Sequence, residues 1–380
     1  MNTGDVTIAG VGNTPFTGGT DSTLVDLAAA AATDALSDAD IDGDEVNSLH
    51  VGNMLAESTN RRAGLANALA SALGLEAIRA TRIENTSASG ASAVHHGVES
   101  ISSGRSETAL VVGVEQMTSR GVAEVTDAIS RLVHEREYEQ GLTLPAFAGL
   151  AADAYLNRHG ADRESLARVA VKNHRNAVEN SIAQYRETVA VEDVLDSPLV
   201  ASPLRLYDCC PMSNGAAALV LDSDCGDVAV TAVASATGTH AVAERRDPLE
   251  VESVRVAGKR AFDAAGCRPK SIDVACVHDA FTILEWLELE ELGFYDNGTA
   301  WRATVDGETA VDGALPVNPG GGLKARGHPL GATGVAQLVE LVWQLRGDVS
   351  PSRRVDGARR GLAVNVAGFG NNSVCTVLET

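Results

Sequence analysis

Apolar runs alternate along the chain with segments in which apolar residues recur at helical spacing, and this alternation predicts a layered α/β protein. In the first half it predicts strands over 5–12, 46–55 and 108–117, and helices over 21–39 and 61–75. Residues 83–97, IENTSASGASAVHHG, predict a further strand that breaks sharply into a helix of small residues. The bend would lift one side chain, that of Ser87, to the N-terminal end of the helix.

The second half repeats the order of the first. It predicts a strand over 228–238, a helix over 249–266, a strand over 272–281, helices over 282–294 and 332–347, and strands within 360–379. Two halves of similar order favour a duplicated fold with an active site between them. Because the sequence identity between the halves is faint, this prediction depends on the order of the elements alone.

Between the halves the pattern changes to polar helices joined by loops, such as a helix over 162–186, which predicts an inserted, lid-like region. The resulting division is an N-terminal half at 1–118, an inserted loop domain at 119–205, a return strand of the first half at 206–224 and a C-terminal half at 225–380. The insert contains a single lysine, Lys172. Its arginines, such as Arg163, Arg168 and Arg175, are spaced for a solvated helix face rather than for a phosphate cradle.

The charge of the chain narrows the class of partner. With 51 acidic and 30 basic residues, the 380-residue chain has a formal net charge of −21. Only four of the basic residues are lysines: Lys172, Lys259, Lys270 and Lys324. An acidic surface argues against nucleic acid or an anionic membrane as the main partner. Acid excess together with few lysines favours a protein kept soluble in high salt, and the alternative is an ordinary acidic enzyme.

The cysteines and the N-terminus bear on the compartment. The six cysteines show no CxxC spacing, so neither a zinc site nor a disulfide framework is predicted. The adjacent Cys209 and Cys210 are either a redox pair or, in our preferred interpretation, part of a packed strand. The first residues lack the basic segment of a signal peptide, and the apolar runs fall short of the roughly 18 residues that a membrane helix needs. We therefore expect a cytoplasmic protein.

Three stretches carry candidate chemistry. The first is the bend at Ser87, where the helix dipole and free backbone N–H groups would favour an attacking anion. The second is VHDAF, which places His278 and Asp279 at the end of a predicted strand. The third is NPGGGLKARGHPLGATG, with His328 between glycine-rich turns. Singly, such a serine is most often a helix cap and such a histidine is merely solvated. Together they indicate an active site.

These stretches resemble the thiolase superfamily, and the resemblance spans essentially the whole chain. GHPLGATG is similar to the Gly-His-Pro signature of thiolases, and HDAF to the His-Asp-Cys-Phe box of sterol-carrier-protein-type thiolases. SASGASAV occupies the place of the motif that carries the nucleophile. The resemblance implies a five-layered αβαβα thiolase fold, usually dimeric or tetrameric, whose inserted loop domain covers bound coenzyme A.

Three positions depart from the family pattern. Ser87 stands where the acyl-accepting cysteine is expected. Ala280 stands where the sterol-carrier-type box has its second cysteine, and Asn365 where conventional thiolases have the cysteine of a Cys-x-Gly motif. Both usual positions of the second acid/base thiol are therefore empty.

The resemblance also implies roles for individual residues. Ser87 would accept the acyl group, His328 would deprotonate it, and His278 would act on the α-carbon of the second substrate or on its enolate. Oxyanion donors would be the Ser87 N–H and backbone groups near Ala367 and Gly368. The substrate loop would consist of Gly327, Pro329 and Gly331 around His328. No metal and no permanent cofactor is implied, since the coenzyme A thioester is itself the substrate.

A narrower resemblance connects the acidic, lysine-poor chain with its serine to the large subunits of haloarchaeal β-ketothiolases. Related archaeal thiolases associate with a small OB-fold, zinc-ribbon-like protein, so such a second subunit is an expected partner. The expected reaction is the Claisen condensation of two acyl-CoA molecules to 3-ketoacyl-CoA and free CoA, and its reverse. The alternatives are a non-catalytic acyl-CoA-binding scaffold, ketoacyl synthase or hydroxymethylglutaryl-CoA synthase chemistry, and an engineered Cys-to-Ser variant. Polyhydroxyalkanoate supply and fatty-acid degradation are both open as pathways.

Overall fold

Helices and strands alternate in both halves of the chain, and the computed structural model describes them over residues 6–380. The N-terminal half contains β1 (Thr7–Asn13), α1 (Leu24–Ala39), β2 (Ser48–Gly52), α2 (Leu65–Ala72), β3 (Arg79–Ile83), α3 (Ser89–Ser102), β4 (Thr108–Gln116) and β7 (Asn214–Asp222). The C-terminal half contains β8 (Val228–Thr237), α9 (Glu252–Ala265), β9 (Val274–Cys276), α10 (Thr282–Glu291), α11 (Ala300–Val305), α12 (Leu330–Arg346), β10 (Arg360–Ala367) and β11 (Asn372–Glu379). Between β4 and β7 lie α4 (Val122–Ser130), α5 (Glu135–Tyr138), α6 (Leu144–His159), α7 (Arg163–Ala177), α8 (Val191–Asp196), β5 (Leu199–Ala201) and β6 (Leu204–Arg205).

The strands of the two halves pair in the same order. The nine-stranded sheet runs β3-β2-β4-β7-β1 and continues as β8-β11-β10-β9. The pairs β2 with β4 and β9 with β10 are parallel, as is the additional pair of β2 with the edge strand β3, and the remaining partners are antiparallel. Thus β1, β2, β4 and β7 correspond to β8, β9, β10 and β11. This order confirms the predicted duplication, and the two units meet where Thr7 and Ile8 of β1 pair with β8.

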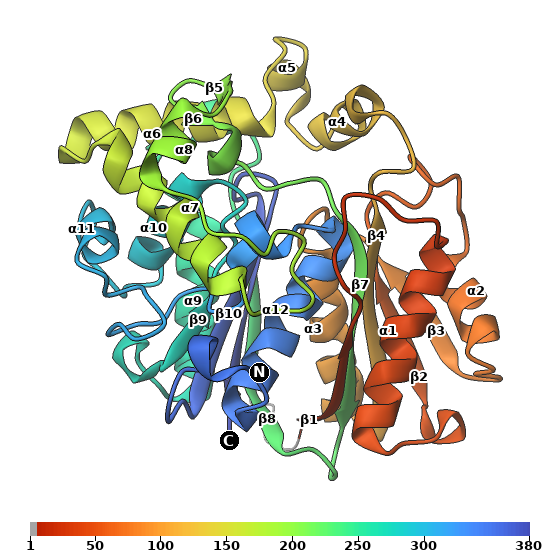
Figure 1. Cartoon of the computed structure of the whole chain (residues 1–380). Helices are drawn as coiled ribbons and strands as arrows, with labels where there is room; N and C mark the ends of the chain where they lie inside the picture. Colours follow the sequence, from red (N-terminus) through yellow and green to blue (C-terminus); the bar gives the residue numbers. More distant parts are fainter. Residues whose placement is uncertain (1–5) are drawn as a thin grey trace.

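Five layers follow from where the helices pack. α1 lies against β1, β4 and β7, and α9 lies against β8 and β11, each on the outer face of its half. α3 and α12 contact each other, and α12 also contacts strands of both halves, including β4, β7 and β10. Figure 1 shows α3 and α12 between the two sets of strands. The predicted αβαβα arrangement is therefore present, and its two central helices come from corresponding places in the two halves.

The central layer is dry because apolar side chains meet there from both sheets. One buried cluster joins strand residues such as Val11 and Val374 to helix residues such as Val94 and Val335. α12 is buried along almost its whole length, since both halves cover it. Residues just before the first turns of α3 and α12 are therefore held in a rigid interior, at the same edge of the molecule.

Three local predictions are wrong. The helix predicted over 162–186 ends at Ala177, and the chain after Asn180 instead bonds to the glycine-rich loop through Gln184 N to Arg326 O. β9 spans only Val274–Cys276, since the polar residues after it turn toward buried side chains. Cys209 and Cys210 are not in a packed strand but lie half-buried ahead of β7. No helix within the described residues is long and apolar enough to cross a membrane.

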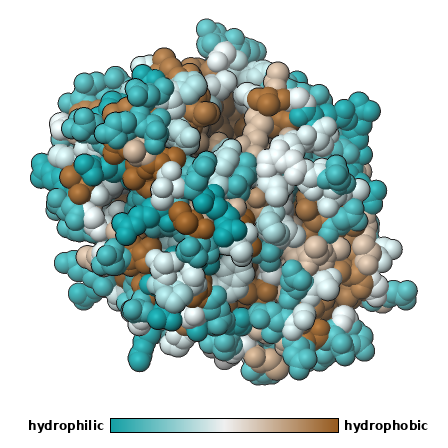
Figure 2. Space-filling model, viewed as in Figure 1, coloured by the Kyte–Doolittle hydropathy of each residue, from teal (hydrophilic) through white to brown (hydrophobic). Residues whose placement is uncertain are grey.

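The acidic surface leads to a prediction on salt. Figure 2 shows a face that is largely hydrophilic with scattered apolar patches, as a charge of −21 requires. Like charges on that surface repel in dilute buffer, and the screening length shortens to about 3 Å in 1 M salt. We expect the thermal unfolding midpoint to rise steeply between dilute buffer and molar KCl. A flat profile in differential scanning calorimetry would contradict the high-salt interpretation without affecting the fold.

Candidate active site

A strained bend presents Ser87 at the start of α3. Thr86, directly before it, has a positive φ of 45°, which is rare for a β-branched residue and marks a sharp turn held by its surroundings. Ser89 stabilises this turn, because its Oγ donates to Thr86 O at 2.6 Å and accepts from Asn85 N at 2.9 Å. Ser87 is itself 3% exposed. The predicted elbow therefore exists, and its serine sits one residue before the N-cap of α3, at the positive end of the helix dipole.

The side chain of Ser87 is free for chemistry. Within residues 6–380 no hydrogen bond to its Oγ is present, whereas the neighbouring Ser89 and Ser92 hydroxyls are both engaged. Asn85 ties the elbow to the far half of the molecule, since its Nδ2 donates to Asn372 Oδ1 at 3.0 Å. Asn372 follows the turn that contains Ala367 and Gly368. The elbow and this turn are therefore neighbours, and the oxyanion role of the two residues stays a prediction.

His328 lies just before α12 with a defined tautomer. Its Nδ1 lies 2.7 Å from Thr333 Oγ1, and that hydroxyl donates its proton to Pro329 O at 3.0 Å. The hydroxyl can therefore only accept from His328, so Nδ1 carries the ring proton. Nε2 is left with a free lone pair. The backbone N–H of His328 donates to Ser213 Oγ at 2.9 Å, which fixes the ring further.

His278 follows β9 and has the opposite tautomer, with its ring proton on Nε2. Asn365 Nδ2 donates to its Nδ1 at 2.9 Å, so the ring proton lies on Nε2. The backbone N–H of His278 donates to Glu288 Oε2 at 2.7 Å. The rings of His278 and His328 meet edge to face with centroids 4.9 Å apart. One histidine thus offers a free lone pair and the other a hydrogen-bond donor, and these two tautomers could not be predicted from the sequence.

Both histidines are kept neutral. Burial lowers the pKa of His278 to about 3, with Arg326 adding to the effect. Burial also lowers the pKa of His328 well below its usual value, and the nearby His278, Arg326 and Lys324 lower it further. A neutral imidazole at the start of α12 is the form that can take a proton.

A pH profile tests this directly. The pKa of a solvated histidine is about 6.5, and these two lie below it. The base is therefore unprotonated on both sides of pH 6.5, and lowering the pH through that value does not remove it. We expect kcat/KM of a reaction that uses unprotonated His328 to change less than about two-fold between pH 7.5 and 5.5 from this cause. A drop of ten-fold per pH unit centred near 6.5 would contradict the neutral histidines.

Glycines bring the serine and the histidines together. A Cβ on Gly90 of α3 would lie 2.5 Å from Gly331 O, so the first turns of α3 and α12 touch through their backbones. A Cβ on Gly334 would collide with both Ala91 N and Asn365 Oδ1. The start of α3, the start of α12 and the asparagine that holds His278 therefore share one small volume. Gly331, predicted in the substrate loop, acts here by permitting this contact.

The other predicted loop residues also support His328. Gly327 has a φ of 109°, and a Cβ there would lie 2.8 Å from Ser213 Oγ, the group that accepts from His328 N. Pro329 supplies the carbonyl that fixes Thr333. The loop therefore positions the His328 ring, while the role of that ring as a base and the contact of the loop with substrate stay predictions.

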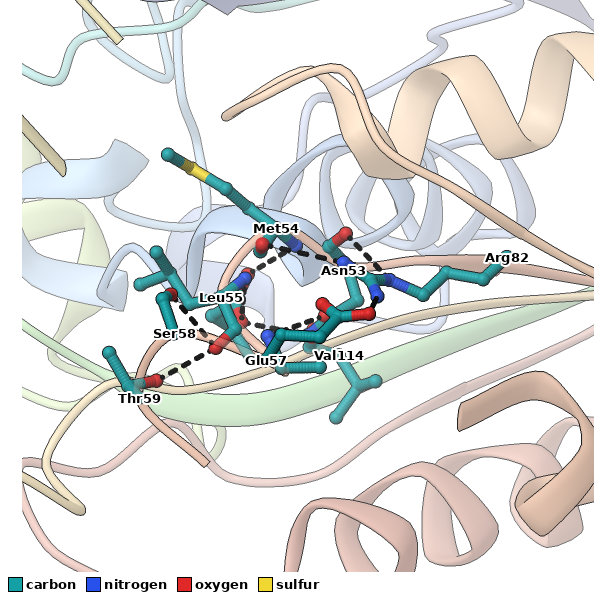
Figure 3. A network of polar contacts seen from close by, with 10 residues as sticks. Asn53, Met54, Leu55, Glu57, Ser58, Thr59, Arg82 and Val114 are labelled. Atoms are coloured by element: carbon teal, nitrogen blue, oxygen red, sulfur yellow. Dashed lines mark hydrogen bonds and ion pairs between the residues drawn. The ribbon is translucent and has the colours of Figure 1, made fainter. Parts of the chain in front are cut away.

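A buried carboxyl that the sequence did not single out anchors the start of α12. Glu115, at the end of β4, accepts from Gly331 N at 3.1 Å, from Asn53 Nδ2 at 2.7 Å and from the backbone N–H groups of Met54 and Leu55. Burial raises the pKa of Glu115 to about 7, although these bonds pull it down. Figure 3 shows Asn53 in this network, with its Nδ2 bonded to Val114 O. Asn53 follows β2 as His278 follows β9, so the duplication could have indicated this position.

A cysteine approaches the place where the second thiol is missing. Cys209 forms an isolated antiparallel bridge with Phe281, and Cys210 N donates to Ala280 O at 2.9 Å. Residues opposite each other in such a bridge direct their side chains to the same face, so the Cys210 thiol lies beside Ala280. Burial raises the pKa of Cys210 to about 12, which keeps the thiol protonated. The same segment pairs Met212 with His328, and thus borders both histidine boxes.

The comparison with known families agrees with this geometry. A profile described as "Thiolase, N-terminal domain" matches residues 6–224, and one described as "Thiolase C-terminal domain-like" matches residues 234–380. The chain belongs to the thiolase family, as the motifs predicted.

Individual relatives cover the whole chain. It is 41% identical to an acetyl-CoA acetyltransferase of Methanothermobacter thermautotrophicus over 99% of both chains. It is 31% identical to sterol carrier protein 2 of Gallus gallus, over 98% of this chain and 71% of that protein. Among solved structures, an Ltp2-ChsH2(DUF35) aldolase matches with a TM-score of 0.86 at 24% identity, covering 99% of this chain and 98% of that one. Human mitochondrial 3-ketoacyl-CoA thiolase matches with a TM-score of 0.78 at 18% identity over all of both chains. These two structures confirm the thiolase fold.

Proposed function

We propose that this chain is the catalytic subunit of a β-ketothiolase that uses an acyl-serine intermediate. The observation that carries the proposal is the geometry of its three groups: an unbonded serine hydroxyl at an elbow, a neutral histidine with a free Nε2, and a second histidine with an Nε2 proton. The 41% identity with an acetyl-CoA acetyltransferase over the full chain supports acyl transfer between coenzyme A thioesters.

In the first half-reaction His328 acts as the base. Ser87 Oγ attacks the thioester carbon while its proton passes to His328 Nε2. The oxygen of the tetrahedral intermediate gains negative charge, which the N–H of Ser87 and donors from the 367–368 turn stabilise. When the carbon–sulfur bond breaks, the coenzyme A thiolate takes the proton from His328. The products are acyl-Ser87 and free CoA, and His328 is neutral again.

In the second half-reaction the regenerated base acts once more. His328 Nε2 removes a proton from the α-carbon of a second acyl-CoA, and His278 Nε2–H donates to the enolate oxygen that forms. The α-carbon attacks the acyl-serine, a carbon–carbon bond forms, and Ser87 Oγ leaves with the proton from His328. One histidine that is neutral before each step therefore replaces the separate thiol that sterol-carrier-type thiolases have at the position of Ala280 and conventional thiolases at that of Asn365.

The insert supports a further partner. Three large apolar side chains on it are well exposed, namely Val122 (69%), Leu150 (61%) and Leu199 (61%), which is unusual on so acidic a surface. The Ltp2-ChsH2(DUF35) aldolase, whose name joins two proteins, has the same fold. We propose that a small OB-fold, zinc-ribbon-like subunit docks on the insert and completes the coenzyme A site. The edge strand β3 leaves room for pairing with a second copy of the chain, so the assembly also contains a dimer or tetramer of this chain.

Reconstitution tests both the activity and the partner. The purified chain alone is expected to bind acyl-CoA poorly and to cleave acetoacetyl-CoA slowly with CoA, and co-expression with a small OB-fold protein encoded nearby is expected to raise both. The readout is loss of 3-ketoacyl-CoA absorbance together with formation of acetyl-CoA. Full activity of the chain by itself in high salt would overturn the two-subunit proposal. No thiolysis with or without the partner would overturn the proposed reaction.

A further inference from the structure

A broad groove beside α7 is lined by several basic residues, although the protein as a whole is acidic. Six basic residues line it: Arg168, Lys172, Arg175, Lys270, Arg353 and Arg354. We call it the basic groove. It has a cavity volume of about 1080 Å³, and it contains two of the four lysines of the chain. Four acidic residues also line it, and three of the six cations already have a carboxylate partner: Lys172 pairs with Glu285, Arg353 with Glu340 and Arg354 with Asp356.

The helix face that seemed merely solvated turns out to be one wall of this groove. Arg168, Lys172 and Arg175 follow one another at spacings of four and three residues, which places them on one face of α7. Segments more than ninety residues away in sequence supply Lys270 and Arg353 opposite them. Arg163, by contrast, pairs with buried Asp208 and does not line the groove. Arg168 and Arg175, for which the sequence predicted only a solvated helix face, therefore also line a groove.

Several of the polar groups in the groove lack a partner. Arg168, Arg175 and Lys270 are exposed and form no ion pair within residues 6–380. Thr309 is fully buried, and its Oγ1 has no hydrogen-bond partner in the described part of the chain. Arg353 is 6% exposed, with Nη1 paired to Glu340 but Nε unpartnered. Buried polar groups are normally satisfied, so these two donors call for an acceptor from outside the chain.

We propose that the basic groove binds a phosphate-bearing small molecule. Guanidinium and ammonium groups facing one another are suited to the several acceptor oxygens of a phosphate, and the volume lies in the range of small-molecule sites. None of Ser87, His278 and His328 lines the groove, so it is a site distinct from the catalytic one. The inference does not depend on the proposed reaction.

Two adjacent residues of α7 nevertheless connect the groove to the active site through hydrogen bonds. Lys172 Nζ bonds to buried Glu285 at 2.6 Å and to Val317 O at 3.2 Å. Its neighbour Asn173 donates to Asp279 at 2.7 Å, and Asp279 follows His278 directly. An anion in the groove therefore lies against the helix that braces the His278 box.

Binding of inorganic pyrophosphate tests the proposal. The probe is titrated calorimetrically into the purified full chain, in the lowest KCl concentration at which the chain stays folded. We expect saturable one-site binding that weakens as KCl rises. The double variant Arg175→Gln/Lys270→Gln removes two exposed cations and is expected to weaken binding at least about ten-fold, because two charge-assisted bonds are lost.

Two single variants serve as controls. Arg62→Gln removes an exposed arginine outside the groove and should leave the dissociation constant unchanged. Asp312→Asn removes an exposed carboxylate that lines the groove and should tighten binding. Absence of binding, or equal loss in Arg62→Gln and in the double variant, would overturn the proposal.

A competition arm identifies the source of the phosphate. If the groove holds a separate ligand, pyrophosphate binds with the same affinity to chain saturated with CoA. If it holds the phosphates of coenzyme A itself, CoA displaces pyrophosphate and dephospho-CoA does so less well. Either result supports a phosphate site in the groove. Pyrophosphate binding that survives the double variant unchanged would place the site elsewhere and contradict the assignment.

Discussion

Ser87→Ala is expected to reduce turnover by about 10⁴-fold or more while leaving the fold intact, as loss of a nucleophile does in other acyl-transfer enzymes. The hydroxyl is small and makes no hydrogen bond within residues 6–380, so its removal leaves neither a cavity of consequence nor an unpaired partner. Thiolysis of acetoacetyl-CoA measures the loss, and circular dichroism checks the fold. Ser87→Cys is expected to keep or raise activity, because a thiol is the better nucleophile.

Ser103→Ala provides the matched control for this result. Ser103 lies at the opposite end of α3, is exposed, and bonds only to the carbonyl of Ser100. Its replacement should leave turnover within about two-fold of the parent chain. Unchanged thiolysis in Ser87→Ala would contradict the assignment of Ser87 as the nucleophile.

Replacing the two histidines separately is expected to affect the two half-reactions differently, because His328 acts in both and His278 only in the second. His328→Ala removes the base and should slow acyl-enzyme formation by about 10²–10⁴-fold. His278→Ala removes the donor to the enolate, so it should slow condensation by about 10²–10³-fold while acylation survives at least in part. Release of free CoA in a single turnover reports the first step, and formation of 3-ketoacyl-CoA reports the second.

The exposed His96 on α3 offers a control for the loss of an imidazole as such. It is 56% exposed, pairs with Glu99 and stacks on the neighbouring His95, all away from the active-site histidines, so His96→Ala should change neither step. Thr333→Val, which removes the acceptor for His328 Nδ1–H, should lower acylation by an intermediate amount because the tautomer is no longer fixed. Equal loss of both steps in both active-site variants would contradict the division of roles.

Much of this account could be predicted from the sequence because it depends on local pattern. The start of α1 is an example, since Thr23 and Asp26 form a capping box, and the residues of such a box are close together in the sequence. The elbow was predictable for the same reason: a strand, a turn and a run of small residues are contiguous. The order of strands and helices also gave the duplication, which places Ser87 and His328 before corresponding helices.

The features of the site that could not be predicted from the sequence depend on contacts between distant segments. Cys210 approaches Ala280 through pairing of residues seventy positions apart, so no local pattern marks it. The tautomers of the two histidines are set by Thr333 and Asn365, one of which was noted only as a missing cysteine. The basic groove joins four separated segments, and its α7 wall alone looked like an ordinary solvated face.

The central claim is that Ser87 carries the acyl group, and mass spectrometry tests it most directly. The chain is incubated with acetyl-CoA, quenched in acid and digested with trypsin, which cleaves after Arg82 and Arg105 and releases peptide 83–105 with Ser87 inside it. The account predicts one added acetyl group on Ser87 in this peptide, its loss when CoA is added before quenching, and its absence from Ser87→Ala. No adduct, an adduct that persists in Ser87→Ala, or an adduct on the peptide that contains Cys210 would contradict it.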